Sequence, residues 1–273
     1  MLAEFAKRPG FVMPEPKNTP GLGTGRVLVL SDAHLLAEFD DRRDTPRLTF
    51  YTALAEAADS VLILGDLVNK LSDYPAILKT RWRSFLYVLS TKNTHLIYGN
   101  HDNGVPPIDP FWKTHQEAVE TQRWGKHIVA MHGHQFDASR HIQFMETPLG
   151  RLFQPMYDRT ETWLIRSRTG SLLQFLVEKT TSRDHKELIS MLDPSRELLL
   201  LGHRHRGLNL AAQGLAETGY SNSDRISWLS MDNDGLRFHA EWIRKINRTN
   251  PMTIPLAQYF ESGHHQKTRP KRK

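Results

Sequence analysis

Five short apolar segments of the chain are each followed, within a few residues, by side chains that bind divalent metals. Val27-Leu28-Val29-Leu30 precedes Asp32 and His34, and Val61-Leu62-Ile63-Leu64 precedes Asp66. Short apolar runs are typical of buried strands, and open α/β sheets bind ligands beyond the carboxyl ends of their strands. We therefore expect the candidate ligands to meet at one edge of a sheet. They are Asp32, His34, Asp66, Asn100, His132, His203 and His205.

This set offers carboxylate, amide and imidazole donors, which suit divalent manganese, iron or zinc. The chain contains no cysteine, so thiolate metal sites, disulfides and a cysteine nucleophile are excluded. A single ion with an open coordination position needs fewer ligands than the chain offers. The set fits two ions that share a bridging carboxylate, about 3.5–4 Å apart, as in two-metal hydrolases. We expect two divalent ions, manganese before iron or zinc.

The order of these residues resembles the calcineurin-like metallophosphoesterase superfamily, over about residues 26–242. The matching motifs are Asp32-Ala33-His34, Gly65-Asp66, Gly99-Asn100-His101-Asp102, His132-Gly133 and Gly202-His203-Arg204-His205. The resemblance implies that Asp66 bridges two ions. It also implies that one ion is held by Asp32, His34 and His205, and the other by Asn100, His132 and His203.

The resemblance further implies that a metal-bridging hydroxide attacks phosphorus, while the ions neutralise charge on the phosphoryl oxygens. His101 would lie near the leaving oxygen as proton donor or charge stabiliser, and Asp102 would position loops or His101. Family members commonly carry an acid three residues after the bridging aspartate, where this chain has Asn69. An amide can orient an imidazole, but it favours the protonated form less than a carboxylate does. His134 is interpreted either as a support of its neighbour His132 or as a loop residue that faces water.

The fold class is predicted to be α/β, with strands and helices alternating before a final hairpin at residues 225–242. Helices are expected over 46–59, where Pro46 suits a first helical turn, over 75–90, and near 111–122. The resemblance implies a metallophosphoesterase-type four-layer α-β-β-α sandwich with mixed sheets and a helical insertion.

Three parts are expected along the chain: an irregular N-terminal extension (1–25), a metallophosphoesterase catalytic domain (26–245), and a basic C-terminal tail (246–273). Apolar residues at helical spacing mark an insertion of about 140–192 inside the catalytic domain. This insertion is longer than a usual connection, so it is expected to form a helical subdomain beside the site.

The insertion resembles the helical lid of the UDP-2,3-diacylglucosamine pyrophosphatase branch, in which helices cover acyl chains. This resemblance favours a small-molecule phosphoester or a lipid phosphate as substrate, and peripheral contact of the insertion with a membrane. Simple packing of the insertion onto the main domain is equally open, as is a nucleotide phosphodiesterase. That branch also typically has Arg where this chain has His101. The sequence leaves monoester, diester and pyrophosphate substrates undecided.

A formal charge of +6 and a pI near 9.5 allow an anionic partner, but much of the excess charge lies in the C-terminal tail. A nuclease of the same superfamily is therefore an alternative function. It is not the favoured one, so nucleic acid is not the expected partner. A non-catalytic scaffold on the same fold is a second alternative. No apolar run reaches the ~18 residues of a membrane span, and charged residues interrupt the N-terminus. The expectation is a cytoplasmic hydrolase, membrane-peripheral if the insertion binds lipid.

Overall fold

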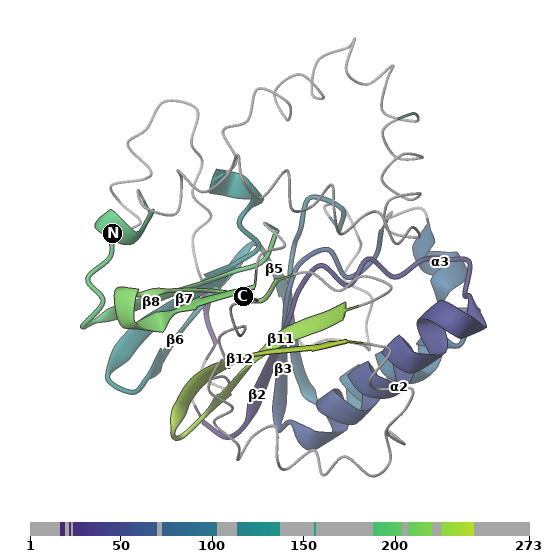
Figure 1. The fold of residues 1–273 in the computed structure, drawn as a ribbon, viewed down its shortest axis with the longest axis horizontal. Coiled ribbons are helices and arrows are strands. Elements are labelled where there is room, and N and C mark those ends of the chain that lie inside the picture. The colour runs from purple at the N-terminus through teal and green to yellow at the C-terminus, as the bar shows by residue number, and fades with distance from the viewer. Residues whose placement is uncertain are drawn as a thin grey trace, which may run out of the picture.

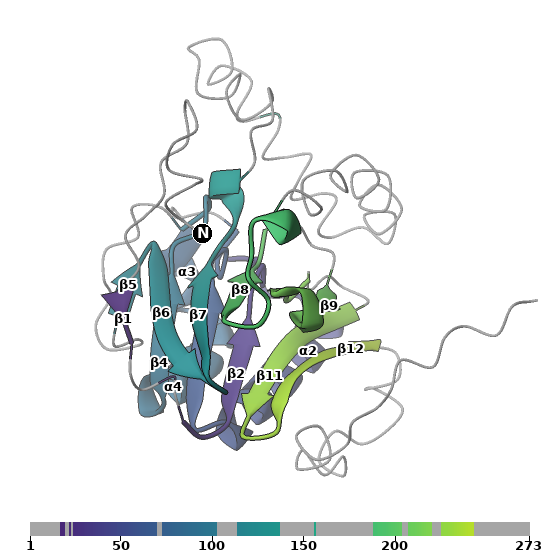
Figure 2. The same ribbon diagram turned by 90° about the vertical axis from the view of Figure 1, so that its left-hand side faces the viewer.

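The computed structural model describes residues 17–19, 22, 24–69, 73–102, 114–136, 156, 188–203, 207–219 and 225–242. Within these residues two six-stranded sheets pack face to face, with helices on the outer side of one of them (Figures 1 and 2). Sheet 1 contains, in spatial order, β12 (Gly235–Trp242), β11 (Arg225–Asp232), β2 (Val27–Leu30), β3 (Ser60–Leu64), β4 (Asn93–Ile97) and β5 (Thr114–Gln116). Sheet 2 contains β1 (Lys17–Asn18), β6 (Ala118–Arg123), β7 (Lys126–Met131), β8 (Glu197–Leu201), β10 (Leu215–Glu217) and β9 (Leu208–Leu210).

Both sheets are mixed, as predicted. In sheet 1, β2, β3, β4 and β5 run parallel, while β11 is antiparallel to β2 and to β12. In sheet 2, β7, β8 and β10 run parallel, while β6 is antiparallel to β7 and β9 is antiparallel to β10. The parallel strands of each sheet thus bring their carboxyl ends to the same edge, and this edge carries the candidate ligands.

The central strands are apolar throughout because both of their faces are buried. In β2, Val27 and Val29 pack between the two sheets, whereas Leu28 and Leu30 pack toward the helices. The outer face of sheet 2 has its own apolar cluster, in which Phe136 and Leu188 cover Val129. Residues 188–190 are helical. The predicted α/β sandwich of two mixed sheets with flanking helices is confirmed.

Helix α2 (Asp41–Ala57) crosses the outer face of sheet 1 (Figure 1). It begins at Asp41, not at Pro46 as expected, because the Asp40 side chain accepts hydrogen bonds from the amides of Arg42 (2.8 Å) and Arg43 (3.1 Å). This cap starts the helix early enough that Pro46 lies inside it.

Two further helix predictions were wrong. The segment expected as one helix over 75–90 forms α3 (Tyr74–Ile77) and α4 (Trp82–Thr91). Thr80 separates them, because its hydroxyl donates to the Ile77 carbonyl (2.7 Å) and accepts from the Trp82 amide (3.2 Å). The helix expected near 111–122 is absent from the described part of that segment, where residues 114–116 form β5 and residues 118–123 form β6.

The sequence of β6 shows why the strand forms. Val119, Thr121 and Arg123 are buried, and the residues between them are more exposed, which is the two-residue period of a strand. Trp124 and Gly125 then turn the chain with positive φ angles of 52° and 70°, as a two-residue hairpin turn requires.

The hairpin predicted at the end of the domain is present as β11 and β12, paired along their full length. The short 3-10 turns η3 (His134–Phe136) and η4 (Ala211–Gln213) follow β7 and β9. Two residues of the extension expected to be irregular form β1, which pairs with β6. Most of that extension, the bulk of the insertion and the whole tail from 246 lie outside the described residues. No helix of the described ranges is both long and apolar enough to cross a lipid bilayer.

Candidate metal centre

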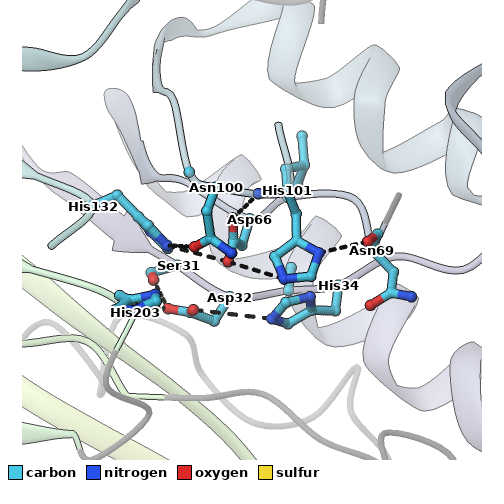
Figure 3. Close-up of polar contacts among 12 residues, drawn as sticks. Ser31, Asp32, His34, Asp66, Asn69, Asn100, His101, His132 and His203 are labelled. Carbon is cyan, nitrogen blue, oxygen red and sulfur yellow. Dashed lines mark hydrogen bonds and ion pairs between the residues drawn. The ribbon is translucent and has the colours of Figure 1, made fainter. Parts of the chain in front are cut away.

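The candidate ligands come from the carboxyl ends of five parallel strands in the two sheets. Asp32 and His34 follow β2, Asp66 follows β3, and Asn100 follows β4. His132 and His203 follow β7 and β8 of the other sheet. Figure 3 shows these side chains pointing toward one another across the junction of the sheets. The seventh candidate, His205, lies outside the described residues.

The backbone at this edge is strained in the same way at four of the candidates. Asp32, His34, Asp66 and His203 have positive φ angles of 52°, 42°, 51° and 62°. Residues with a Cβ rarely adopt this left-handed conformation, and such strain gathers at functional sites. Hydrogen bonds that extend the parallel pairing beyond the strands hold it. The amide of Asp32 donates to the Gly65 carbonyl at 3.1 Å, and that of His34 donates to the Asp66 carbonyl at 3.0 Å.

Two glycines let the ligand loops approach closely. A Cβ on Gly99 would lie 1.9 Å from Asp66 Oδ1, and one on Gly202 would lie 2.0 Å from Ser31 Oγ. Both distances are far below a van der Waals contact. The glycines of the Gly-Asn-His-Asp and Gly-His motifs are therefore required by the packing of the loops.

Asp66 is the centre of the arrangement. Its Oδ2 lies 3.1 Å from His132 Nε2, and the same nitrogen lies 3.1 Å from Asn100 Oδ1 (Figure 3). Asp66 belongs to two groups whose donor atoms all lie within 4.8 Å of one another. One group joins it to His34 and His101, and the other joins it to His132 and His203. Asp66 is therefore the carboxylate that the two groups have in common.

The tautomer of His132 suits metal binding. Its Nδ1 lies 2.6 Å from the Leu64 carbonyl oxygen, which can only accept, so Nδ1 carries the hydrogen. In the neutral ring, Nε2 then presents its lone pair toward Asp66 and Asn100. A backbone carbonyl commonly orients a ligating histidine in this way.

Asp32 is fully buried, and its carboxylate accepts from the Ser31 hydroxyl and from the amide of His203 (2.9 Å). Its other oxygen, Oδ1, lies 4.0 Å from His34 Nε2. Asp32 therefore links the ends of β2 and β8 while facing the site. Sequence reasoning missed Ser31, although its place directly before the Asp-x-His motif was a usable signal.

His101 lies at the opening of the cluster. Its Nδ1 donates to the backbone carbonyl of Asn69 at 2.7 Å, and its Nε2 lies 3.9 Å from Asp66 Oδ2. Its ring packs edge-on against that of His34, with centroids 5.0 Å apart. The contact with position 69 was expected from the amide side chain, but the main chain makes it.

Asp102 is buried under the cluster and connects its loops. Its carboxylate accepts from the amides of Leu67, Val68 and Gly99, each at 3.3 Å. These contacts favour the loop-positioning interpretation of this residue. Its inclusion among the catalytic residues stays a prediction. His134 has its ring centroid 5.4 Å from that of His132 and 6.2 Å from that of His203, which supports a role beside those residues.

The charges in this buried cluster shift its pKa values. Burial disfavours the charged form of His132, but the carboxylates of Asp66 and Asp32 and the Leu64 carbonyl together outweigh burial and raise the pKa of His132 to about 9. Burial alone would raise the pKa of Asp66, yet His132 and His101 hold it well below its usual value. Burial and the Asp66 charge raise the pKa of Asp102 to about 7.

These residues fit a divalent cation. The donors are oxygen and nitrogen atoms, and the buried carboxylates of Asp66 and Asp32 hold His132 protonated. A cation can replace that proton and balance the same negative charge. Donor atoms separated by 3.1 Å, as around His132 Nε2, are spaced as neighbouring ligands of one small ion are.

The two-sheet α/β fold and the cluster of candidate metal ligands define a class of metal-binding α/β protein, and comparison gives the family. A model of calcineurin-like phosphoesterases (Metallophos) matches residues 25–207, and the chain belongs to this family. All seven candidate ligands, from Asp32 to His205, fall inside the match. The family typically binds divalent metals. No curated protein sequence matches the chain.

Similar solved structures have low identity to this chain. They include an archaeal phosphodiesterase (9% identity, 80% of this chain and 99% of that one, TM-score 0.39). Vacuolar protein sorting 29 from Cryptosporidium parvum is 16% identical, over 80% of this chain and 98% of that one, with a TM-score of 0.36. A dimetal phosphatase from Danio rerio is 11% identical, over 79% and 98%, with a TM-score of 0.36. At these values the structures bear on neither substrate nor mechanism.

Proposed function

We propose that the protein is a dinuclear metal-dependent hydrolase of a phosphodiester or pyrophosphate bond. One observation carries the proposal: Asp66 takes part in both groups of convergent donors, with His34 and His101 on one side and His132 and His203 on the other. Two ions that share this carboxylate would supply Lewis acidity for the phosphoryl oxygens and an acidified water as nucleophile.

The protein's own residues would then divide the work by position. Asp32, His34 and His205 would hold one ion, and Asn100, His132 and His203 would hold the other. The Leu64 carbonyl orients the His132 ring so that Nε2 faces the site. The buried apolar residues on both sides of the parallel strands keep this edge rigid, as a preorganised site requires.

His101 is the candidate for proton transfer to the leaving oxygen. Its Nδ1 is held by the Asn69 carbonyl, so Nε2 is the atom that can gain and donate a proton. The ring is partly exposed, unlike the buried Asp66 and His132. Nε2 is therefore available to a substrate above the cluster.

For the substrate, we propose a lipid-linked or nucleotide phosphoester, with the UDP-2,3-diacylglucosamine pyrophosphatase-like branch as the specific hypothesis. Its support is the apolar insertion of about 140–192, whose main part lies outside the described residues. The same insertion would give peripheral membrane contact. Manganese is the proposed metal, with iron or zinc as alternatives, and the cytoplasm is the proposed compartment.

The test is metal-dependent hydrolysis of bis-p-nitrophenyl phosphate. Protein stripped with a chelator is expected to be inactive and to regain activity with Mn²⁺. A protein that binds two ions yet hydrolyses neither this diester nor a pyrophosphate would instead be a non-catalytic scaffold. Cleavage confined to nucleic acid would identify a nuclease of the same family.

A further inference from the structure

Arg47 is a fully buried arginine that contacts the backbone between two candidate metal ligands. It lies on α2, and its Nη2 donates to the carbonyl oxygen of Ala33 at 2.5 Å. Ala33 separates Asp32 from His34 in the Asp-x-His motif. The sequence gives no hint of this contact, because Arg47 stands fourteen residues along the chain in a helix.

The segment that Arg47 contacts needs support from outside. Asp32 and His34, on either side of Ala33, both have left-handed φ angles, of 52° and 42°. This conformation costs about 1 kcal/mol for each residue that has a Cβ. On one side, the loop after β3 holds the segment through the carbonyls of Gly65 and Asp66. On the other side, Arg47 binds the peptide carbonyl.

The surroundings of Arg47 fix its guanidinium group. Its Nη1 lies 3.3 Å from Asp44 Oδ1, and the group lies 5.6 Å from the ring centroid of Trp82 and 5.9 Å from that of Tyr51. Asp44 is also buried, and Arg43 Nε donates to it at 2.8 Å. Arg47 therefore holds the segment Asp32-Ala33-His34 in a fixed position relative to α2.

Stability alone does not require an arginine here. A buried ion pair costs several kcal/mol in desolvation, and removing one partner is strongly destabilising only where it leaves the other charge unpaired. If Arg47 were removed, Asp44 would keep its contact with Arg43. An arginine at this position is explained by what its planar donors do for the Ala33 carbonyl.

We propose that Arg47 is a positioning residue, which orients Asp32 and His34 and thereby sets the affinity for the metal ion that these two residues hold. The inference rests on the proposed function, because it requires that ion. Removing a group that orients metal ligands typically weakens binding by about 10- to 100-fold.

The test is Arg47→Met in the full chain, titrated with Mn²⁺ by calorimetry after removal of metal. One of two ions is expected to bind about 10- to 100-fold more weakly, and the other within about twofold of wild type. The unfolding temperature of the metal-free variant should stay near that of wild type. Arg81→Met is the matched control. Arg81 also forms an ion pair with α2, to Asp41 at 2.6 Å, and its guanidinium lies 5.3 Å from the ring centroid of Phe39. In this variant both ions should bind as in wild type.

A second background locates the effect. In His34→Ala, which removes a ligand of the same ion, adding Arg47→Met should change the affinity for the remaining ion by less than about twofold. A further 10- to 100-fold loss of affinity for the remaining ion would overturn the inference. If Arg47→Met fails to fold, Arg47→Lys decides, since one ammonium cannot satisfy both Ala33 and Asp44 in the arginine geometry. It should weaken the same ion by about threefold or more, and wild-type affinity would overturn the inference.

Other outcomes separate this inference from the proposed function. Equal weakening of both ions together with a lower unfolding temperature would reduce Arg47 to core packing, and unchanged binding of both ions would exclude positioning. Either result leaves the proposed hydrolase standing. Wild-type protein that binds two ions without hydrolysing a phosphoester would defeat the proposed function and leave the inference on Arg47 intact. Wild-type protein that binds fewer than two ions would overturn both.

Discussion

His101 Nδ1 donates to the backbone carbonyl of Asn69 across 2.7 Å, so position 69 orients the imidazole through its main chain. The side chain at this position is therefore free to differ from the acid that family members commonly carry. Asn69→Ala should lower turnover of bis-p-nitrophenyl phosphate by less than about tenfold, which corresponds to about 1.4 kcal/mol of transition-state stabilisation. Steady-state kinetics measure this directly. A loss as large as that of His101→Ala would show that the amide side chain holds the ring.

His101→Ala should lower turnover by about 10²- to 10⁴-fold, because it removes the proposed proton donor. It should leave two ions bound, since His101 is proposed to act on the leaving oxygen. Metal content per chain, measured by mass spectrometry, checks this. The result matters because His101 also lies in one of the two convergent donor groups, beside His34 and Asp66. Loss of one ion from the variant would make His101 a ligand.

Asp66→Ala should abolish binding of both ions and all activity, because Asp66 belongs to both donor groups. Asp59→Ala is the matched control. Asp59 directly precedes β3, at the end opposite Asp66, where its carboxylate accepts a hydrogen bond from the Arg26 amide at 2.7 Å. Asp59→Ala should leave metal content and turnover unchanged. Retention of near wild-type turnover by Asp66→Ala would refute the site.

Metal affinity should rise with pH, by about tenfold per unit from pH 7 to pH 8, because an ion must displace the proton of His132. The pKa of that imidazole is raised from 6.5 to about 9 in the folded protein, chiefly by the Asp66 carboxylate against the effect of burial. In metal-free protein, this shift stabilises the fold fully below pH 6.5, and the stabilisation is lost as pH rises through 9. The pKa of Asp102 is likewise raised, from 3.8 to about 7, so its contribution to stability also falls as pH rises, between about pH 4 and pH 7.

Thermal unfolding with and without Mn²⁺ at several pH values tests this expectation. The unfolding temperature of metal-free protein should fall from pH 6.5 to pH 9, and the stabilisation by added metal should grow over the same range. His132→Gln should remove most of the slope in the metal-free protein. A slope equal to that of wild type would assign the titration to another group.

Deleting the middle of the insertion should spare bis-p-nitrophenyl phosphate and abolish hydrolysis of lipid-linked substrates, if the insertion covers acyl chains. The deletion should stop before Leu188, because Leu188 and Leu192 pack with Phe136 against sheet 2. Activity on matched substrates with and without acyl chains is the measurement. Equal loss of both activities would reduce the insertion to packing.

The strands that carry the ligands could be predicted from the sequence because both of their faces are buried, which leaves uninterrupted apolar runs. Strands β5 and β6 were missed. Residues 114–123 are mostly polar and were predicted as a helix, whereas their pairing with β4 and β7 buries alternate side chains of β6. The start of α2 was misplaced because the cap at Asp40 decides it, not Pro46.

Within the site, residue types and order were sufficient to propose the ligands, but not the contacts that hold them. The carbonyls of Leu64 and Asn69 and the guanidinium of Arg47 all contact groups that are distant in sequence. Such contacts have no local signature. They depend on how the strand ends meet across the two sheets, which the fold alone determines.

Four of the candidate ligands have the left-handed backbone conformation, which glycine adopts at lower energy than any residue with a Cβ. Mutation and selection for thermal stability alone would therefore tend to place glycine at Asp32, His34, Asp66 and His203. Each such change would relieve backbone strain and remove a donor atom. If the proposed metal centre were lost by mutation, the loss would consequently begin as a gain in stability.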